Sequence, residues 1–233
     1  MIKVTDLSFS ISGKEILNNV NFSVDDNTSL IISGPSGAGK TKLLEIISGF
    51  ERSYTGKVSI GGSPLENLGD DLYDMISYVS NSWLENTLSE KVMSDLVFPL
   101  ELKNLPEHVI KEKLDRIISV FNLEDLIDVP PMNLSGGEKQ FVNICTMIIK
   151  EPKILMIDDQ MTMIDRGKRE IIFKEIIRSK KHTAVVISKD TNIYSEFDKI
   201  LFLDKGSVYY FGDTVTFNKE HRSKLIDTGL IEK

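Results

Sequence analysis

The residues best suited to chemistry form an eight-residue glycine-rich segment that fits the pattern G-x-x-x-x-G-K-[ST]. They are Gly34, Pro35, Ser36, Gly37, Ala38, Gly39, Lys40 and Thr41. Glycines let backbone N–H groups converge on phosphate oxygens, while Lys40 supplies a positive charge and Thr41 a hydroxyl for Mg²⁺. Because an apolar run at 30–33 precedes the segment and a helical pattern follows it, we favour phosphate binding over a simple glycine-rich turn.

Two adjacent carboxylates follow a second apolar run, at 154–157. The carboxyl ends of strands in α/β sheets are where ligands gather. Asp158 is therefore the natural acidic partner of Mg²⁺, directly or through water, and Asp159 is placed to orient or activate an attacking water. A helix cap or a turn is the alternative for an Asp pair after a core strand.

A second candidate anion site is the segment Leu134-Ser135-Gly136-Gly137-Glu138. Ser135 and Glu138 fit the S-x-x-E capping box, so a plain helix start is one interpretation. However, Gly136 and Gly137 in a first helical turn each cost about 1 kcal/mol relative to Ala. Since glycines let a ligand approach backbone N–H groups closely, we expect this helix N-terminus to hold an anion.

The elements that must position these residues are short apolar runs separated by turn signals and by one long helical stretch. The runs span residues 2–9, 20–24, 29–33, 57–60, 76–79, 154–157, 184–187 and 200–203. The later runs are apolar throughout, which is typical of parallel strands covered on both faces. Between 79 and 154 the apolar residues recur with helical spacing, and a further helix is expected at 166–178.

These patterns predict an α/β fold: a P-loop NTPase core with a mostly parallel sheet, an N-terminal antiparallel β flank and an inserted helical subdomain. We place the ATP-binding core and its flank at residues 1–80 and 151–233. The inserted helical subdomain is placed at residues 81–150, where it carries the second candidate anion site.

Composition narrows the possible classes of protein. The 233 residues include 28 Lys+Arg against 35 Asp+Glu, a net charge of −7, and 41% are hydrophobic. No stretch approaches the roughly 18 apolar residues of a membrane span, so a membrane role is expected only through partners. Cys145 is the single cysteine, which excludes an intramolecular disulfide and fits a reducing cytosol. The acidic balance disfavours a broad nucleic-acid interface, and no nucleic acid is expected.

Taken together, the segments at 34–41, 134–138 and 154–159, with Asp165 after them, resemble the nucleotide-binding subunit of an ATP-binding cassette (ABC) transporter. In that family two cassettes pair head to tail, and each ATP lies between the P-loop of one chain and the signature of the other. The resemblance implies an ATPase with ATP and Mg²⁺ as cofactors. It also implies a second cassette and integral membrane permease subunits as partners, and a peripheral position on the cytoplasmic face of the membrane.

The resemblance assigns roles to individual residues. Ser135, Gly136 and Gly137 would contact the γ-phosphate of ATP held by the partner cassette, while Thr41 and Asp158 would bind Mg²⁺. Residues 98–101 and the helix after them also look like the helical subdomain of energy-coupling-factor and cobalt-type importers.

Four positions depart from the family pattern. Ile11 stands where an aromatic residue stacks on adenine, and Phe9, expected on the same strand face, is a candidate substitute. Asn81 stands where a glutamine helps to bind Mg²⁺ and reports to the membrane partner. Asp159 replaces the glutamate that polarises the attacking water, and Lys189 replaces the histidine that contacts the γ-phosphate.

All four departures belong to the half-site around this chain's own P-loop, whereas the signature it would lend to a partner is intact. We therefore expect slow hydrolysis at its own site and a heterodimer with a standard cassette, although a homodimer and harmless drift in an ordinary ATPase stay open. The alternative functions are a nucleotide-dependent regulatory clamp with negligible turnover and a soluble ABC protein outside transport.

Overall fold

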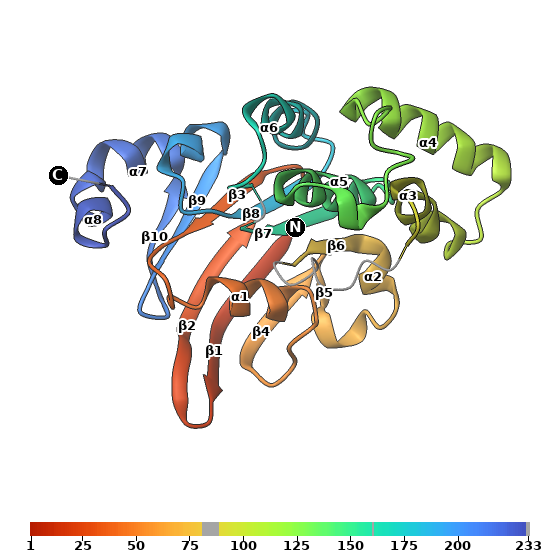
Figure 1. Cartoon of the computed structure of the whole chain (residues 1–233). Helices are drawn as coiled ribbons and strands as arrows, with labels where there is room; N and C mark the ends of the chain where they lie inside the picture. Colours follow the sequence, from red (N-terminus) through yellow and green to blue (C-terminus); the bar gives the residue numbers. More distant parts are fainter. Residues whose placement is uncertain (81–88, 160, 232–233) are drawn as a thin grey trace.

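The computed structural model describes residues 1–80, 89–159 and 161–231, which form two β-sheets with helices around them (Figure 1). The antiparallel sheet has the order β2 (Lys14–Val24), β1 (Ile2–Ile11), β4 (Thr55–Ile60) and β5 (Ser63–Pro64). The six-stranded sheet has the order β10 (Ser207–Asp213), β9 (Lys199–Asp204), β3 (Ser29–Ser33), β8 (Thr183–Ile187), β7 (Ile154–Asp158) and β6 (Ile76–Val79). Only β10 runs antiparallel to its neighbour in that sheet. The predicted α/β class and antiparallel flank are therefore confirmed.

Successive residues of the central strands enter two different hydrophobic clusters, because side chains alternate across a strand. Leu155 and Ile157 of β7 belong to the cluster that includes the helices on one face. Ile154 and Met156 belong to the cluster shared with the antiparallel sheet on the other face. Burial on both faces is why these strands read as continuous apolar runs in the sequence.

Helix α1 (Lys40–Ile47) lies between the two sheets and directly follows the glycine-rich segment. Its buried residues include Leu43, Leu44, Ile46 and Ile47, which share one cluster with strands of both sheets. A helix packed on two sides is fixed in position, so its N-terminus is held at the carboxyl end of β3.

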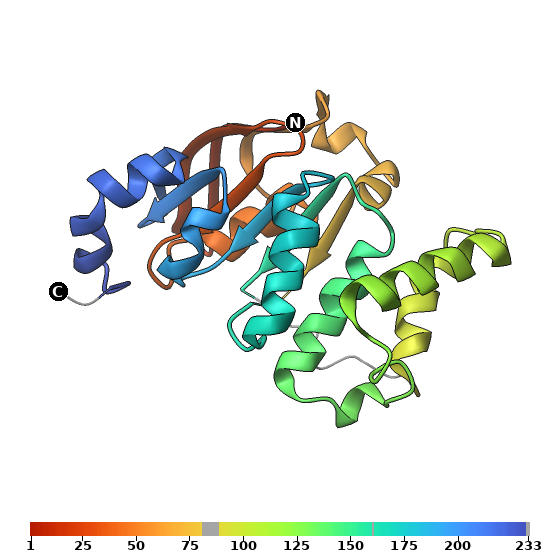
Figure 2. The same ribbon diagram turned by 90° about the horizontal axis from the view of Figure 1, so that it is seen from above.

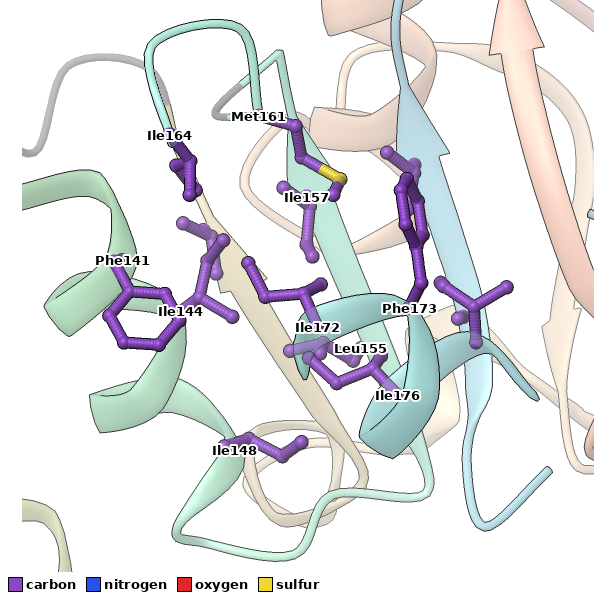
Figure 3. Packing of buried hydrophobic residues seen from close by; sticks show 14 of the residues in the cluster. Phe141, Ile144, Ile148, Leu155, Ile157, Met161, Ile164, Ile172, Phe173 and Ile176 are labelled. Carbon is purple, nitrogen blue, oxygen red and sulfur yellow. The ribbon is translucent and has the colours of Figure 1, made fainter. Parts of the chain in front are cut away.

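The opposite face of the six-stranded sheet is covered by α5 (Gly136–Ile148) and by α6 (Arg166–Ile172) with its π-helical continuation η4 (Phe173–Arg178). Figure 3 shows Phe141 and Ile144 of α5, and Ile172 of α6, converging on Leu155 and Ile157 of β7. The helix expected at 166–178 is thus present, with a change of helical type at Phe173.

Between β6 and β7 the chain forms α3 (Val92–Glu101), α4 (Glu107–Phe121), the turn η3 (Pro131–Asn133) and α5. Figure 2 shows α3 and α4 at one end of the molecule, opposite α7 (Thr214–Glu220) and α8 (Arg222–Asp227). Leu96 of α3 and Phe121 of α4 share a hydrophobic cluster with the central sheet. Because these helices pack on the central sheet, their contacts do not mark a domain boundary. The helical subdomain placed at residues 81–150 stays a prediction.

The remaining short elements are η1 (Leu65–Asn67), α2 (Asp71–Met75) and η5 (Thr191–Glu196). Strand β10 was not predicted from the apolar runs, because its side chains are only half-buried at the edge of the sheet. None of the helices in the described part of the chain is both long and apolar enough to cross a membrane.

Candidate nucleotide-binding site

The glycine-rich segment, residues 34–41 and here called the P-loop, joins the carboxyl end of β3 to α1. Gly34 has a φ of 137°, and a Cβ there would lie 2.0 Å from the carbonyl oxygen of Leu203 in β9. Only glycine fits so close to a neighbouring strand. Ser36 and Gly37 are exposed at the crest of the loop, where a ligand can reach them. The strand–loop–helix placement expected from the sequence is present.

Lys40 is 7% exposed and points back into its own loop. Its ammonium donates hydrogen bonds to the carbonyl oxygens of Gly34, at 2.7 Å, and Pro35, at 2.8 Å. Burial, followed by repulsion from Lys189, lowers the pKa of Lys40 to about 8, although Asp159 and Asp158 oppose the shift. The loop thus surrounds the Lys40 ammonium, whose hydrogen bonds are to carbonyl oxygens of the loop itself. A cation with so few partners suits the loop to an anionic ligand.

Asp158 ends β7 and is 2% exposed. Its two carboxylate oxygens accept hydrogen bonds from different elements: Oδ1 from the Thr41 hydroxyl at 3.3 Å and Oδ2 from the Tyr78 hydroxyl at 3.2 Å. Burial raises the pKa of Asp158, and these two hydrogen bonds oppose the rise. Thr41 and Asp158 were singled out from the sequence, and the structure brings them together.

Tyr78 is a site residue that the sequence reasoning missed. It lies on β6, directly beside Met156 of β7 in the parallel register, and its ring packs against Phe50 with 5.5 Å between centroids. In the sequence, Tyr78 stands out only as the one hydroxyl-bearing aromatic residue in a mostly apolar strand. Its position beside Asp158 becomes evident only when β6 is known to pair with β7.

The donor set around Thr41 and Asp158 fits Mg²⁺. A hydroxyl and a carboxylate are hard oxygen ligands, and Mg²⁺ commonly takes one or two carboxylates together with phosphate oxygens and water. In residues 1–80, 89–159 and 161–231, no group of three or more His, Cys, Asp or Glu side chains is arranged to hold a metal. The few protein ligands here match an ion that arrives with a phosphate ligand.

Asp159 and Lys189 lie at the ends of adjacent strands. Asp159 has a φ of 52°, and its N–H donates to the carbonyl oxygen of Ile187 in β8 at 3.2 Å. The exposed Lys189, two residues after β8, donates from its ammonium to the Ser36 hydroxyl at 2.8 Å. Burial raises the pKa of Asp159, while Lys189 and then Lys40 oppose the rise. The two lysines and two aspartates therefore form one electrostatic cluster at the P-loop.

The remaining residues predicted for this half-site have different outcomes. Ile11 lies at the end of β1 and is 45% exposed. The expectation that Phe9 could substitute for it is wrong. Phe9 is 4% exposed and belongs to the hydrophobic cluster between the two sheets, so its ring is not available to a ligand. Asn81 lies outside the described residues.

The segment 134–138, here called the signature segment, begins α5 with the predicted capping box. The Ser135 hydroxyl accepts a hydrogen bond from the Glu138 N–H at 3.3 Å, and the Glu138 carboxylate accepts one from the Ser135 N–H at 2.9 Å. Lys168 lies 3.6 Å from Glu138 and 3.5 Å from Asp165, which links this turn to the start of α6.

The glycine pair of the signature segment has a packing role that the sequence reasoning missed. A Cβ on Gly137 would lie 2.4 Å from the backbone carbonyl oxygen of Met163, and one on Gly136 would lie 2.9 Å from the Met163 side-chain terminus. The loop before α6 therefore presses directly on the first turn of α5. Glycine is required at 137 by this contact, whatever else the turn binds.

The sequence of this chain is similar to those of known proteins. A family model described as ABC transporter matches residues 17–162, more than half of the chain. The spermidine/putrescine import ATP-binding protein PotA of Thermotoga maritima is 27% identical over 215 residues, covering 91% of this chain and 58% of that protein. The energy-coupling factor transporter ATP-binding protein EcfA1 of the same organism is 25% identical over 218 residues, covering 93% and 83%.

Among solved structures, the post-hydrolysis dimer of the ATP-binding cassette MJ0796 bound to ADP and Pi superposes with a TM-score of 0.81 at 23% identity, covering 92% of this chain and 99% of that one. This likeness supports the fold alone. The chain spans less than three fifths of the length of PotA. The family match contains the P-loop, the signature segment, and Asp158 and Asp159 at the carboxyl end of β7, and the chain is therefore a member of the ABC transporter family.

Proposed function

We propose that this chain is an ATP-binding subunit that pairs with a second cassette around ATP and drives a membrane permease from its cytoplasmic face. The observation that carries the proposal is the convergence of Lys40, Thr41, Asp158 and Lys189, from the ends of three neighbouring strands, at one exposed loop. PotA and EcfA1 are named as ATP-binding proteins of transporters, and MJ0796 is described as a dimer.

The reaction we infer is transfer of the γ-phosphoryl group of ATP to water. A bond forms between the water oxygen and the γ-phosphorus as the bond to the bridging β–γ oxygen breaks, giving ADP and phosphate. Lys40 and the loop amides would neutralise phosphate charge, and Lys189, held at Ser36, would contact the γ-phosphate. Asp159 would accept a hydrogen bond from the attacking water and orient it.

Thr41 and Asp158, with Asn81, are the residues proposed to hold Mg²⁺, which neutralises phosphate charge when bound. Ser135, Gly136 and Gly137 are proposed to contact the γ-phosphate of ATP on a partner cassette. Ser135 is exposed and the two glycines are half-buried, so their N–H groups lie at a surface that a second chain can approach.

We further propose that this chain's own site hydrolyses ATP slowly. Asp159 is one methylene shorter than glutamate, and a misplacement of about 1 Å can reduce a rate on the order of a hundredfold. Lys189 can only donate hydrogen bonds, whereas a neutral histidine can also accept one. Since the signature segment is intact, a heterodimer with a standard cassette would contain one competent and one impaired site.

Steady-state ATPase measurements test this proposal. We expect wild-type turnover to be slow but above that of Lys40→Ala, and Asp159→Glu to raise it by about tenfold or more. Lys189→His is the second attempted restoration, and Asp115→Glu, at an exposed position of α4, serves as a matched Asp-to-Glu control outside the P-loop. Turnover equal to that of Lys40→Ala, with no gain in either restoration, would contradict the hydrolase interpretation and favour the regulatory clamp.

Capture of the chain from native membranes tests the partners. We expect a second, different cassette and a permease subunit to co-purify in the presence of MgATP. Recovery of this chain only with copies of itself would contradict the heterodimer.

A further inference from the structure

A cavity of about 400 Å³ lies at the end of the six-stranded sheet opposite to the P-loop. Lys153 and His182, which line it, immediately precede β7 and β8. Asp158 and Lys189 lie at the other ends of the same two strands. A five-residue strand spans roughly 16 Å, so the cavity is separate from the candidate nucleotide site.

The floor of the cavity is apolar. It is formed by Ile117 and Phe121 of α4 and by Ile148 and Ile149 at the end of α5, each at most 7% exposed. Val120, which is 36% exposed, forms part of the wall nearest to solvent. The volume falls in the range of small-molecule sites, which span roughly 300–1,000 Å³, and the cavity combines this apolar floor with charged groups around it.

The rim of the cavity is basic, although the whole chain carries a net charge of −7. Its charged residues are Lys113, Arg116, Lys153 and Lys181 against Glu151 and Glu175, a local excess of 4 − 2 = +2. Glu151 pairs with both Lys113 and Arg116, whereas the Lys181 ammonium is 3.8 Å from Glu175. Lys153 has no ion pair among the described residues.

We propose that this cavity binds a small organic acid. The apolar part of this acid, of about the size of two fused aromatic rings, would lie against the floor of the cavity. The carboxylate or sulfonate of the acid would face Lys153 and Lys181. Charge complementarity selects the acid, because a neutral or cationic ligand would leave the positive excess of the rim uncompensated. This proposal does not depend on nucleotide binding.

The location of the cavity gives the ligand a bridging position. One wall comes from α4 and the end of α5, and the other from the residues that precede β7 and β8. A bound acid would therefore contact the helices between β6 and β7 and, at the same time, the strands whose far ends carry Asp158 and Lys189.

The test uses the full chain and the fluorescent probe 1-anilinonaphthalene-8-sulfonate, titrated by fluorescence and calorimetry with saturating MgATP present. We expect one saturable site per chain. Val120→Trp, which fills the cavity, should weaken binding about tenfold or more. Lys153→Glu should weaken it about fivefold. Lys111→Glu, an exposed lysine of α4 outside the cavity, should leave the affinity unchanged.

A second probe isolates the acidic group. N-phenyl-1-naphthylamine has the same ring system without the sulfonate, and we expect it to bind about fivefold more weakly than the sulfonate. Melting curves establish that each variant is folded; if Val120→Trp is not, Lys153→Glu and the neutral probe decide. Unsaturable binding, displacement by MgATP, or unchanged affinity in Lys153→Glu would overturn the proposal.

Discussion

The P-loop and the signature segment are both helix N-termini built with glycine, yet they are completed in different ways. Around the P-loop, polar side chains from four strands or their ends converge, and two of them, Lys40 and Asp158, are buried charges. The signature segment instead satisfies its own first turn through Ser135 and Glu138 and packs against the loop at Met163. The first is a charged cluster, and the second is an exposed, capped turn.

This difference fits the proposal that two chains share one reaction. The P-loop region holds charges that already interact with one another, so a ligand there must replace existing contacts, such as those of Lys40 with two carbonyl oxygens. In the signature segment Glu138 is the only charged side chain, and its carboxylate caps the segment's own first turn. The segment can contribute backbone N–H groups but cannot by itself complete a phosphate site.

The sharpest test of the signature segment compares its two glycines. We expect Gly137→Ala to lower the free energy of unfolding by about 2 kcal/mol, because its Cβ would meet backbone at 2.4 Å. Gly136→Ala should change stability by less than about 1 kcal/mol, since Met163 can turn its side chain away and Ala favours the helix. Urea denaturation measures both. Equal stability of the two variants would contradict the packing role of Gly137.

The P-loop region should respond to charge rather than to packing. We expect Lys189→Met to weaken MgATP binding about fivefold at pH 7, because a charge-assisted contact to phosphate is lost. Lys57→Met, which removes an exposed lysine from β4, is the matched control. Calorimetric titration measures both affinities, and an unchanged affinity in Lys189→Met would separate Lys189 from the phosphate site.

Proton uptake on ligand binding is a second test of the role of charge at the P-loop. The pKa of Lys40 is about 8 without ligand, so at pH 8.5 much of it is neutral, and a bound phosphate favours the charged form. Binding of preformed MgATP at pH 8.5 should therefore take up protons, and affinity should fall as pH rises through 8. Because Lys189 contributes to the lowered pKa, Lys189→Met should reduce the uptake. Titration in buffers of different ionisation enthalpy measures it, and no uptake in wild type would contradict the assignment.

An effect of similar size to that of Lys189→Met is expected at Tyr78. Tyr78→Phe keeps the ring beside Phe50 but removes the hydrogen bond that orients Asp158. Such a bond contributes about 1 kcal/mol, so the Mg²⁺ concentration that half-saturates nucleotide binding should rise about fivefold. Tyr73→Phe, on an exposed position of α2, is the control. An identical Mg²⁺ dependence in Tyr78→Phe would show that Tyr78 does not position Asp158.

Much of the P-loop site was predictable from the sequence, because the residues that mark it lie close together along the chain. An apolar run followed by glycines and Lys40 defines a strand, a loop and a helix within about 18 residues, 30–47. Asp158 after its apolar run was found in the same way. Fully buried strands leave a continuous apolar trace that needs no knowledge of their neighbours.

The features that were missed depend on tertiary contacts. Tyr78 acquires its role only when β6 pairs with β7, and Gly137 only when the loop at Met163 packs on α5. The error at Phe9 arose because sequence spacing gives no measure of burial, and Phe9 packs in the core whereas Ile11 is exposed at the end of β1. Strand β10 was overlooked because edge strands bury too little to leave an apolar run.

Calorimetric titration of the folded full chain with MgATP at pH 7 tests the central claim most directly. The geometry of Lys40 inside the P-loop predicts one nucleotide per chain and an affinity reduced about a hundredfold or more in Lys40→Ala, since removing a buried charged partner costs several kcal/mol. No uptake of MgATP by folded wild-type protein, or equal affinity in Lys40→Ala, would contradict it.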